Sequence, residues 1–224
     1  MNGALAIFAK TVGLSPVKTR LAADIGKADA EAFYTLSIKA VAQLAEALQK
    51  QMPNQLTVHW ALAEEEALEH PAWCQFKTLW TGDGDLGNRL HTIYSRLQKT
   101  HDYVMLIGTD SPQLSPDILL NAINQFKKWP QSCFIGPSLD GGFYLFLSAT
   151  HIAKQAWTNV TYSWHTTLQQ LVVQLKQQNI DVELLGRHGD VDIAGDFVPL
   201  LKALQANDNL LPAQEQLLDW LKSR

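Results

Sequence analysis

A wholly apolar run, residues 103–107, ends abruptly at Gly108-Thr109-Asp110-Ser111-Pro112. A strand that is apolar at every position is buried on both faces, as central strands are in parallel sheets with helices on each side. In such sheets the carboxyl ends of the strands line the ligand crevice. We therefore expect the Asp110 carboxylate to point into a site. A turn or cap role is the alternative, because Asp side chains often serve both.

Apolar segments alternate with helical ones along the chain. The pattern predicts strands at 4–9, 56–61, 76–80, 103–107, 133–135, 143–147 and 182–185, and helices at 27–51, 86–99, 116–128, 163–178, 195–205 and 213–222. The helical segments carry apolar residues every three or four positions, as amphipathic helices do. Alternating strands and helices predict an α/β fold, a three-layer α/β/α sandwich with a mostly parallel central sheet, in one domain over residues 1–224.

Composition narrows the classes of partner. The net charge is -4 and the basic residues are scattered, so we expect no nucleic-acid partner, whereas small anionic molecules remain suitable. Cys74 and Cys133 lack any metal-ligand or redox spacing and are interpreted as reduced thiols. With no signal-peptide pattern and no run long enough to span a bilayer, we expect a soluble cytoplasmic protein without a membrane partner. The oligomeric state is left open.

Two cations follow the first predicted strand closely. Lys18 and Arg20 flank Thr19 after a loop that starts at Lys10. Charge and the guanidinium fork suit them to phosphate oxygens. The glycine spacing of a Walker A loop is absent. A helix start with solvated basic side chains is the alternative interpretation.

Two glycine-containing segments also follow predicted strands. Residues 82–87 match the G-x-G-x-x-G string, but Asp83 and Asp85 would repel a bound pyrophosphate, so a dinucleotide site is disfavoured. Arg89 lies one turn into the following helix. The second segment, Asp140-Gly141-Gly142, would let the backbone approach a ligand closely, or would form a hairpin turn between two strands.

An acidic pair, Asp190 and Asp192, flanks Val191 near the end of the chain. Carboxylate oxygens at this spacing suit a hard cation. The alternative is that one of them caps the helix that follows.

Taken in order, these segments resemble the bacterial DUF2064 family over roughly residues 4–200. The matching strings are Phe8-Ala9-Lys10, Val17-Lys18-Thr19-Arg20-Leu21, Gly84-Asp85-Leu86-Gly87-Asn88-Arg89-Leu90, Ile107-Gly108-Thr109-Asp110-Ser111-Pro112, Gly136-Pro137, Asp140-Gly141-Gly142-Phe143-Tyr144 and Asp190-Val191-Asp192. That family belongs to the nucleotide-diphospho-sugar transferase (GT-A type) superfamily, and some members are labelled arsenosugar-biosynthesis glycosyltransferases. More distantly, the chain is similar to 2-phospholactate guanylyltransferases and molybdenum-cofactor nucleotidyltransferases.

The resemblance implies roles for particular residues. Lys10, Lys18 and Arg20 would bind the nucleotide phosphates, and Gly84, Asp85 and Arg89 would lie near the base or ribose. Asp110 would contact the nucleotide and a metal ion. The acceptor side would hold Asp140, Gly141, Gly142 and Trp164, with Asp140 as the activating base and Lys18 as the second catalytic group.

The resemblance also implies a cofactor and an activity. Because residues 109–111 keep a single carboxylate, a second ligand to Mg²⁺ or Mn²⁺ must come from Asp192 or Asp190. The expected activity is metal-dependent transfer from a nucleotide-diphospho-sugar to a small-molecule acceptor. The alternatives are a nucleotidyltransferase, which joins a nucleoside triphosphate to a phosphorylated small molecule with pyrophosphate release, and a non-catalytic nucleotide-binding module.

Overall fold

The computed structural model describes residues 1–224 and builds one sheet in the order β3-β2-β1-β4-β6-β5-β7. All neighbouring strands are parallel except β6, which is antiparallel to both β4 and β5. The predicted mostly parallel sheet is therefore confirmed. The strands are β1 Gly3–Ala9, β2 Leu56–Leu62, β3 Lys77–Trp80, β4 Tyr103–Ile107, β5 Cys133–Pro137, β6 Phe143–Ser148 and β7 Val182–Leu184.

Most helices match the sequence pattern, and the two shortest were not predicted. Helix α2 has the predicted bounds, but α1 and α5 were not predicted as separate helices, and α6 begins four residues after the predicted start at 163. The helices are α1 Thr19–Ile25, α2 Lys27–Gln51, α3 Leu86–Gln98, α4 Pro116–Phe126, α5 Lys154–Thr158, α6 Thr167–Gln177, α7 Phe197–Gln205 and α8 Pro212–Lys222, with 3-10 turns at Glu65–Ala67, Pro71–Trp73 and Ala194–Asp196.

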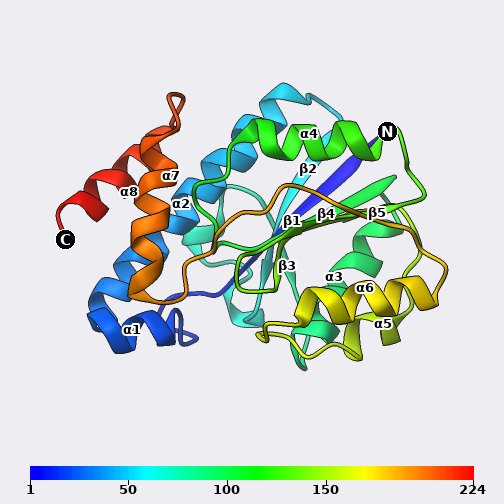
Figure 1. Ribbon diagram of the computed structural model, residues 1–224, viewed down its shortest axis with the longest axis horizontal. Coiled ribbons are helices and arrows are strands. Elements are labelled where there is room, and N and C mark those ends of the chain that lie inside the picture. The colour runs from blue at the N-terminus through cyan, green and yellow to red at the C-terminus, as the bar shows by residue number, and fades with distance from the viewer.

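The sheet is covered on both faces, which makes the three predicted layers (Figure 1). Side chains of a strand alternate between faces. In β4, Met105 packs with α2 and α4 on one face, while Leu106 packs with α3, α5 and α6 on the other. The full burial of β4 that the apolar run predicted is confirmed.

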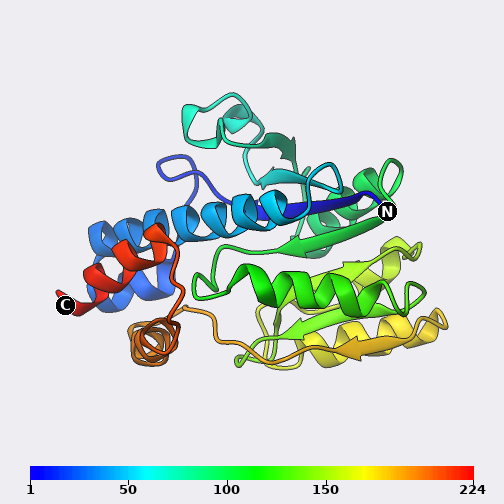
Figure 2. The same ribbon diagram turned by 90° about the horizontal axis from the view of Figure 1, so that it is seen from above.

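A third apolar cluster joins helices at one end of the molecule. Leu21 of α1 and Phe33 of α2 pack there with residues of α7 and α8, and Figure 2 shows these helices together at the end opposite the N-terminus. Val191 belongs to the same cluster and is 1% exposed. The cluster therefore anchors the segment that carries Asp190 and Asp192. No helix of the chain has the length and apolar character that crossing a bilayer requires.

Candidate functional site

The strand order places a crevice beside Asp110. From β1 the chain continues to β2 on one side, while β4 pairs with β1 on the other, so the connections diverge between β1 and β4. Such a switch point is where open α/β sheets bind ligands, outside the carboxyl ends of the strands. A cavity of about 780 Å³ opens there, and both Lys10 and Asp110 line it.

Lys18 is the most constrained cation of this cavity. Its backbone is left-handed (φ 46°), and its side chain is only 5% exposed. The Nζ atom lies 2.5 Å from Oδ1 of Asp110 and 3.7 Å from Oδ1 of Asp192, and it donates a hydrogen bond to the Val191 carbonyl. The structure thus brings together a cation after β1, a carboxylate after β4 and the distant acidic pair.

The acidic pair is held so that its carboxylates face the cavity. The Val191 N–H donates to the Asp110 carbonyl at 3.0 Å, which ties the segment to the end of β4. Asp196 accepts hydrogen bonds from the N–H groups of Asp192 and Ile193, so the capping role falls to Asp196. Arg20 lies 3.2 Å from Oδ2 of Asp192 and remains largely exposed. The interpretation of the basic segment as a helix start with solvated side chains is correct in part, because α1 begins at Thr19 and Arg20 is exposed, whereas the Lys18 side chain is buried.

Asp140 joins the acidic pair, which sequence reasoning did not foresee. One carboxylate oxygen each of Asp140, Asp190 and Asp192 lie within 4.8 Å of one another. Burial, followed by the neighbouring Asp140 and Asp192 charges, raises the pKa of Asp190 to about 7. Three converging carboxylates provide the all-oxygen donor set that Mg²⁺ or Mn²⁺ prefers. These residues therefore fit the implied cation. Asp110 also lines the cavity and is paired with Lys18.

The Asp140-Gly141-Gly142 segment forms the hairpin turn that its sequence allowed, and the turn borders the cavity. It joins β5 to β6 as a hairpin, and Asp140 accepts a hydrogen bond from the Gly142 N–H at 2.8 Å. Gly142 and Asp140 line the large cavity. Gly141 lines an adjoining cavity of about 260 Å³. The turn thus separates two hollows that share Asp140.

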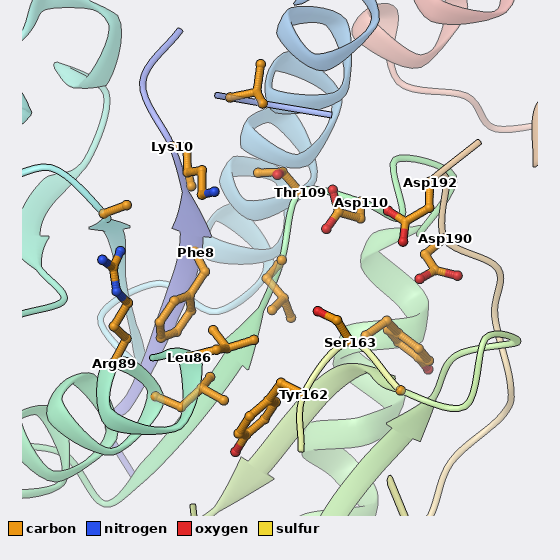
Figure 3. A pocket seen from close by; sticks show the side chains of 18 of the residues that line it. Phe8, Lys10, Leu86, Arg89, Thr109, Asp110, Tyr162, Ser163, Asp190 and Asp192 are labelled. Carbon is orange, nitrogen blue, oxygen red and sulfur yellow. The ribbon is translucent and has the colours of Figure 1, made fainter. Parts of the chain in front are cut away.

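The opposite wall of the large cavity combines apolar and basic side chains. Figure 3 shows Phe8, Leu86 and Arg89 on one side and the three labelled aspartates on the other. Arg89 donates from Nε to the Gly84 carbonyl at 3.1 Å. The cavity therefore has an acidic end and a separate end formed by β1 and the first turn of α3.

The loop after β1 is fixed mainly through its backbone. The Tyr34 hydroxyl accepts from the Lys10 N–H at 2.8 Å and donates to the Lys10 carbonyl at 3.2 Å, while burial raises the pKa of Tyr34. The Lys10 ammonium is exposed and reaches only the Pro16 carbonyl, at 3.4 Å. The Thr11 N–H donates to the buried Glu64 carboxylate at 3.0 Å.

Two of the predicted site residues line neither of the two cavities. Asp85 caps α3, because its Oδ1 accepts from the Asn88 N–H at 2.9 Å, and these hydrogen bonds lower the pKa of Asp85. Trp164 is 56% exposed, with its ring beside that of His165, whereas the preceding Ser163 lines the cavity. The Asp85 side chain therefore serves as a helix cap, and the Trp164 side chain lies exposed on a loop.

Several lining residues were missed because nothing in the sequence distinguishes them from core residues. Tyr34 falls on the apolar stripe of α2, and Thr81 follows a short edge strand. Tyr162 precedes a helix whose start was misplaced. They can be assigned to the cavity only when the topology is known, because the fold determines which strand and helix ends meet there.

The fold and the site define a GT-A-type α/β protein of the nucleotide-diphospho-sugar transferase class of folds. More particularly, the chain belongs to the DUF2064 family, described as uncharacterized proteins conserved in bacteria, whose model matches residues 41–164. That match includes Arg89, Asp110 and Asp140. A search of curated proteins gave no match.

Solved structures support the fold over the full chain. A candidate nucleotide-diphospho-sugar transferase from Desulfovibrio desulfuricans G20 has a TM-score of 0.82 at 21% identity, covering 100% of this chain and 98% of that one. A CMP:2-keto-3-deoxy-manno-octonic acid synthetase in complex with CTP has a TM-score of 0.54 at 13% identity, with 92% and 99% covered. The 4-diphosphocytidyl-2C-methyl-D-erythritol synthase of Anaerococcus prevotii DSM 20548 has a TM-score of 0.53 at 12% identity, with 91% and 96% covered. At these identities the similarity establishes the fold alone.

Proposed function

We propose that the protein is a Mg²⁺- or Mn²⁺-dependent transferase that takes a nucleotide-diphospho-sugar as donor and a small molecule as acceptor. The observation that carries this proposal is the pairing of Lys18 and Arg20 with the aspartates at the switch point. Phosphates bring negative charge that needs cations, and the carboxylates would hold a divalent ion that supplies further positive charge. When bound, that ion would neutralise charge that develops on the leaving diphosphate.

The chain's own residues divide the remaining work. Asp192, Asp190 and Asp110 are the proposed cation ligands, and a carboxylate oxygen of Asp140 lies within 4.8 Å of the first two. Lys18 and Arg20 bind the diphosphate, with Lys10 available at the loop. Lys18 stabilises the leaving group as the second catalytic residue, because its ammonium already faces the acidic end of the cavity.

The acceptor side lies around the Asp140-Gly141-Gly142 turn. Asp140 is exposed and borders both cavities, so it can reach a hydroxyl proton of an acceptor held in either. Gly141 and Gly142 bring backbone close to that position, and Trp164 lies on the neighbouring loop. Asp140 can act as base only while the cation is held by the other aspartates.

A nucleotidyltransferase is the second candidate. Two of the solved structures of similar fold are, by their names, synthetases of nucleotide-linked products, and one holds CTP. Against this, the loop between β1 and α1 contains a single glycine, Gly13, and is poor in the backbone donors that glycine-rich loops offer to a triphosphate.

The two reactions differ in their products. Incubation with a panel of nucleoside triphosphates and nucleotide sugars, with and without Mn²⁺, should yield nucleoside diphosphate from a nucleotide sugar. Release of pyrophosphate from a triphosphate would establish the nucleotidyltransferase instead. Binding also stabilises the folded state by mass action, so a shift in melting temperature detects even an unproductive donor. If no nucleotide shifts it, the protein is not a nucleotide-dependent enzyme.

A further inference from the structure

We propose that Arg89 and Thr81 select the nucleobase, and that the base presents two adjacent acceptor atoms, as guanine and cytosine do. This inference rests on the proposed function and extends it to the chemical class of the donor. It concerns the end of the cavity that faces away from the aspartates (Figure 3).

Arg89 has an unused binding edge. It is half-buried and forms no salt bridge, although Asp83 and Asp85 are close in sequence. Its Nε is already bonded to the Gly84 carbonyl, which fixes the plane of the guanidinium. The two Nη groups remain as a fork of parallel donors. Because Arg89 lines the large cavity, a ligand bound there can accept hydrogen bonds from these free donors.

Thr81 supplies an independent observation. It lines the same cavity, is 1% exposed, and its Oγ1 atom has no hydrogen-bond partner. Buried hydroxyls are nearly always hydrogen-bonded, so each exception calls for an explanation. A ligand edge in the cavity provides one, after rotation of the side chain about χ1.

Two apolar side chains of the same cavity suit a flat aromatic ring. Phe8 at the end of β1 and Leu86 in the first turn of α3 both line the cavity, and Leu86 is 41% exposed despite being apolar. Apolar and aromatic faces stack on any nucleobase without distinguishing one from another. Discrimination must therefore come from the polar edge, which Arg89 and Thr81 provide.

The geometry of a guanidinium fork defines which bases match. Arginine binds the O6 and N7 atoms of guanine in a bidentate manner. Cytosine offers a comparable pair in O2 and N3. In adenine, the acceptors N1 and N7 each lie beside the N6 amino group, which is a donor. In uracil, the N3–H donor lies between the O2 and O4 acceptors. Binding either of these would leave one Nη unpaired, which lowers affinity.

The test compares four nucleoside diphosphates, GDP, CDP, ADP and UDP, by isothermal titration calorimetry in the presence of Mn²⁺. We expect GDP or CDP to bind at least tenfold more tightly than ADP and UDP, and the comparison of GDP with CDP identifies the base. Equal binding of all four would overturn the base selection while leaving the proposed function intact. Failure of all four to bind would contradict the proposed function itself.

Three variants assign the selection to its residues. Arg89→Lys keeps the charge but loses the fork, so the preference should fall to within about threefold. Thr81→Val keeps the side-chain volume and should weaken only the preferred base, without lowering the melting temperature, because the hydroxyl that it removes has no partner. Arg96→Met on the exposed face of α3 is the control and should change nothing.

Two results would overturn the assignment. One is an Arg89→Lys variant that retains the full preference. The other is an Arg89→Met variant that weakens all four nucleotides by the same factor, which would make Arg89 a phosphate contact. Circular dichroism of each variant establishes that the fold is retained.

Discussion

Lys18 occupies an unusual position for a lysine. Its ammonium lies between Asp110 and Asp192 and is almost fully buried, and these are two of the carboxylates proposed to hold a divalent cation. An ammonium and a metal ion cannot share the same oxygens at short range. Without a nucleotide, Lys18 therefore competes with the metal. A bound diphosphate would draw the ammonium away and release both carboxylates.

Replacing Lys18 with Met should consequently raise the affinity for Mn²⁺ in the absence of nucleotide. We expect a gain of about tenfold, equivalent to about 1.4 kcal/mol, together with a marked loss of diphosphate binding. Electron paramagnetic resonance of free Mn²⁺ measures the first effect, and calorimetry with a nucleoside diphosphate measures the second. Lys10→Met, whose ammonium reaches only a carbonyl, is the control. Unchanged or weaker Mn²⁺ binding by Lys18→Met would show that no competition exists.

Asp190 supports a prediction about stability. Its pKa of about 7 lies above the ordinary carboxyl value of 3.8, so the folded state favours the protonated form. The stability contributed by that preference is complete at pH values below 3.8 and is lost as the pH rises through 7. Asp190→Asn should therefore stabilise the metal-free protein at pH 8, by about 1–2 kcal/mol after allowance for partial exposure, but give little at pH 4.

Urea unfolding at the two pH values measures this difference, with the exposed Asp83→Asn as the control. Addition of Mn²⁺ to the unchanged protein should abolish the advantage of the variant, because the ion would neutralise the same charges. Destabilisation of Asp190→Asn at pH 8 without metal would contradict the repulsion inferred from the three carboxylates.

At the scale of elements, the Asp140-Gly141-Gly142 turn depends on close contact with the loop before α6. Gly141 has φ +93°, and a Cβ placed on it would lie 2.0 Å from the His165 carbonyl oxygen. Gly13 has nearly the same φ, +91°, with no atom within 4 Å of its would-be Cβ. Alanine at Gly13 would therefore test backbone strain alone, whereas alanine at Gly141 would add a steric clash.

Alanine at the two positions should have unequal effects. We expect Gly13→Ala to cost about 1 kcal/mol of unfolding free energy from the positive φ alone. Gly141→Ala should cost about 3 kcal/mol or more, because the clash with backbone adds to the strain, and should weaken Mn²⁺ binding by displacing Asp140. Equal costs in a urea titration would show that the turn does not pack tightly on this loop.

The elements also show which parts of the structure the sequence could predict. Strands β1, β2 and β4 are recognisable as apolar runs, and α2 is long enough for its periodicity to define both ends. Helices α1 and α5, with seven and five residues, span too few turns for a periodic pattern. The reversed direction of β6 was predicted only as one alternative, the hairpin at Asp140-Gly141-Gly142, because hydrophobic patterning itself carries no information on strand direction.

The residues of the site also divide into those that the sequence could predict and those that it could not. Asp110 could be predicted because a buried strand ends directly before a carboxylate, and the acidic pair and basic pair stand out in the sequence. The grouping of Asp140 with Asp190 could not, because it depends on how a hairpin folds against a segment 50 residues later. Thr81 and Tyr34 resemble core residues until the topology places them at the cavity.

Across the whole molecule, the charged residues of the proposed site lie outside the apolar core, although core residues such as Leu106 and Ile107 also line the cavity. The two large apolar clusters lie on the faces of the sheet, while the cavity lies at the carboxyl ends of its strands. Variants in the cavity can therefore alter ligand binding with modest effects on the core. Among the buried titratable groups with no role in the site is His59 of β2, which packs near His101.

His59 should make the stability of the whole molecule depend on pH. Both of its ring nitrogens are buried without partners, and burial, followed by the nearby His101, Lys77 and Arg96, lowers the pKa of His59 to about 4. A lowered pKa means that the folded state favours the neutral ring, so the contribution is complete above pH 6.5 and is lost as the pH falls towards 4. The loss should reach about 2–3 kcal/mol.

His59→Phe keeps an aromatic ring and removes the titration. As the pH falls from 7 to 4, the unfolding free energy of this variant should therefore rise relative to that of the unchanged protein. Chemical unfolding at closely spaced pH values measures that difference and cancels the carboxylate effects that both proteins share. His151→Gln, at an exposed position, should show no such shift. Because Asp190 acts in the opposite direction over the same pH interval, the pH dependence of the unchanged protein alone would understate the His59 effect. A constant difference across the interval would mean that the charged ring of His59 finds solvent or a partner in the folded state.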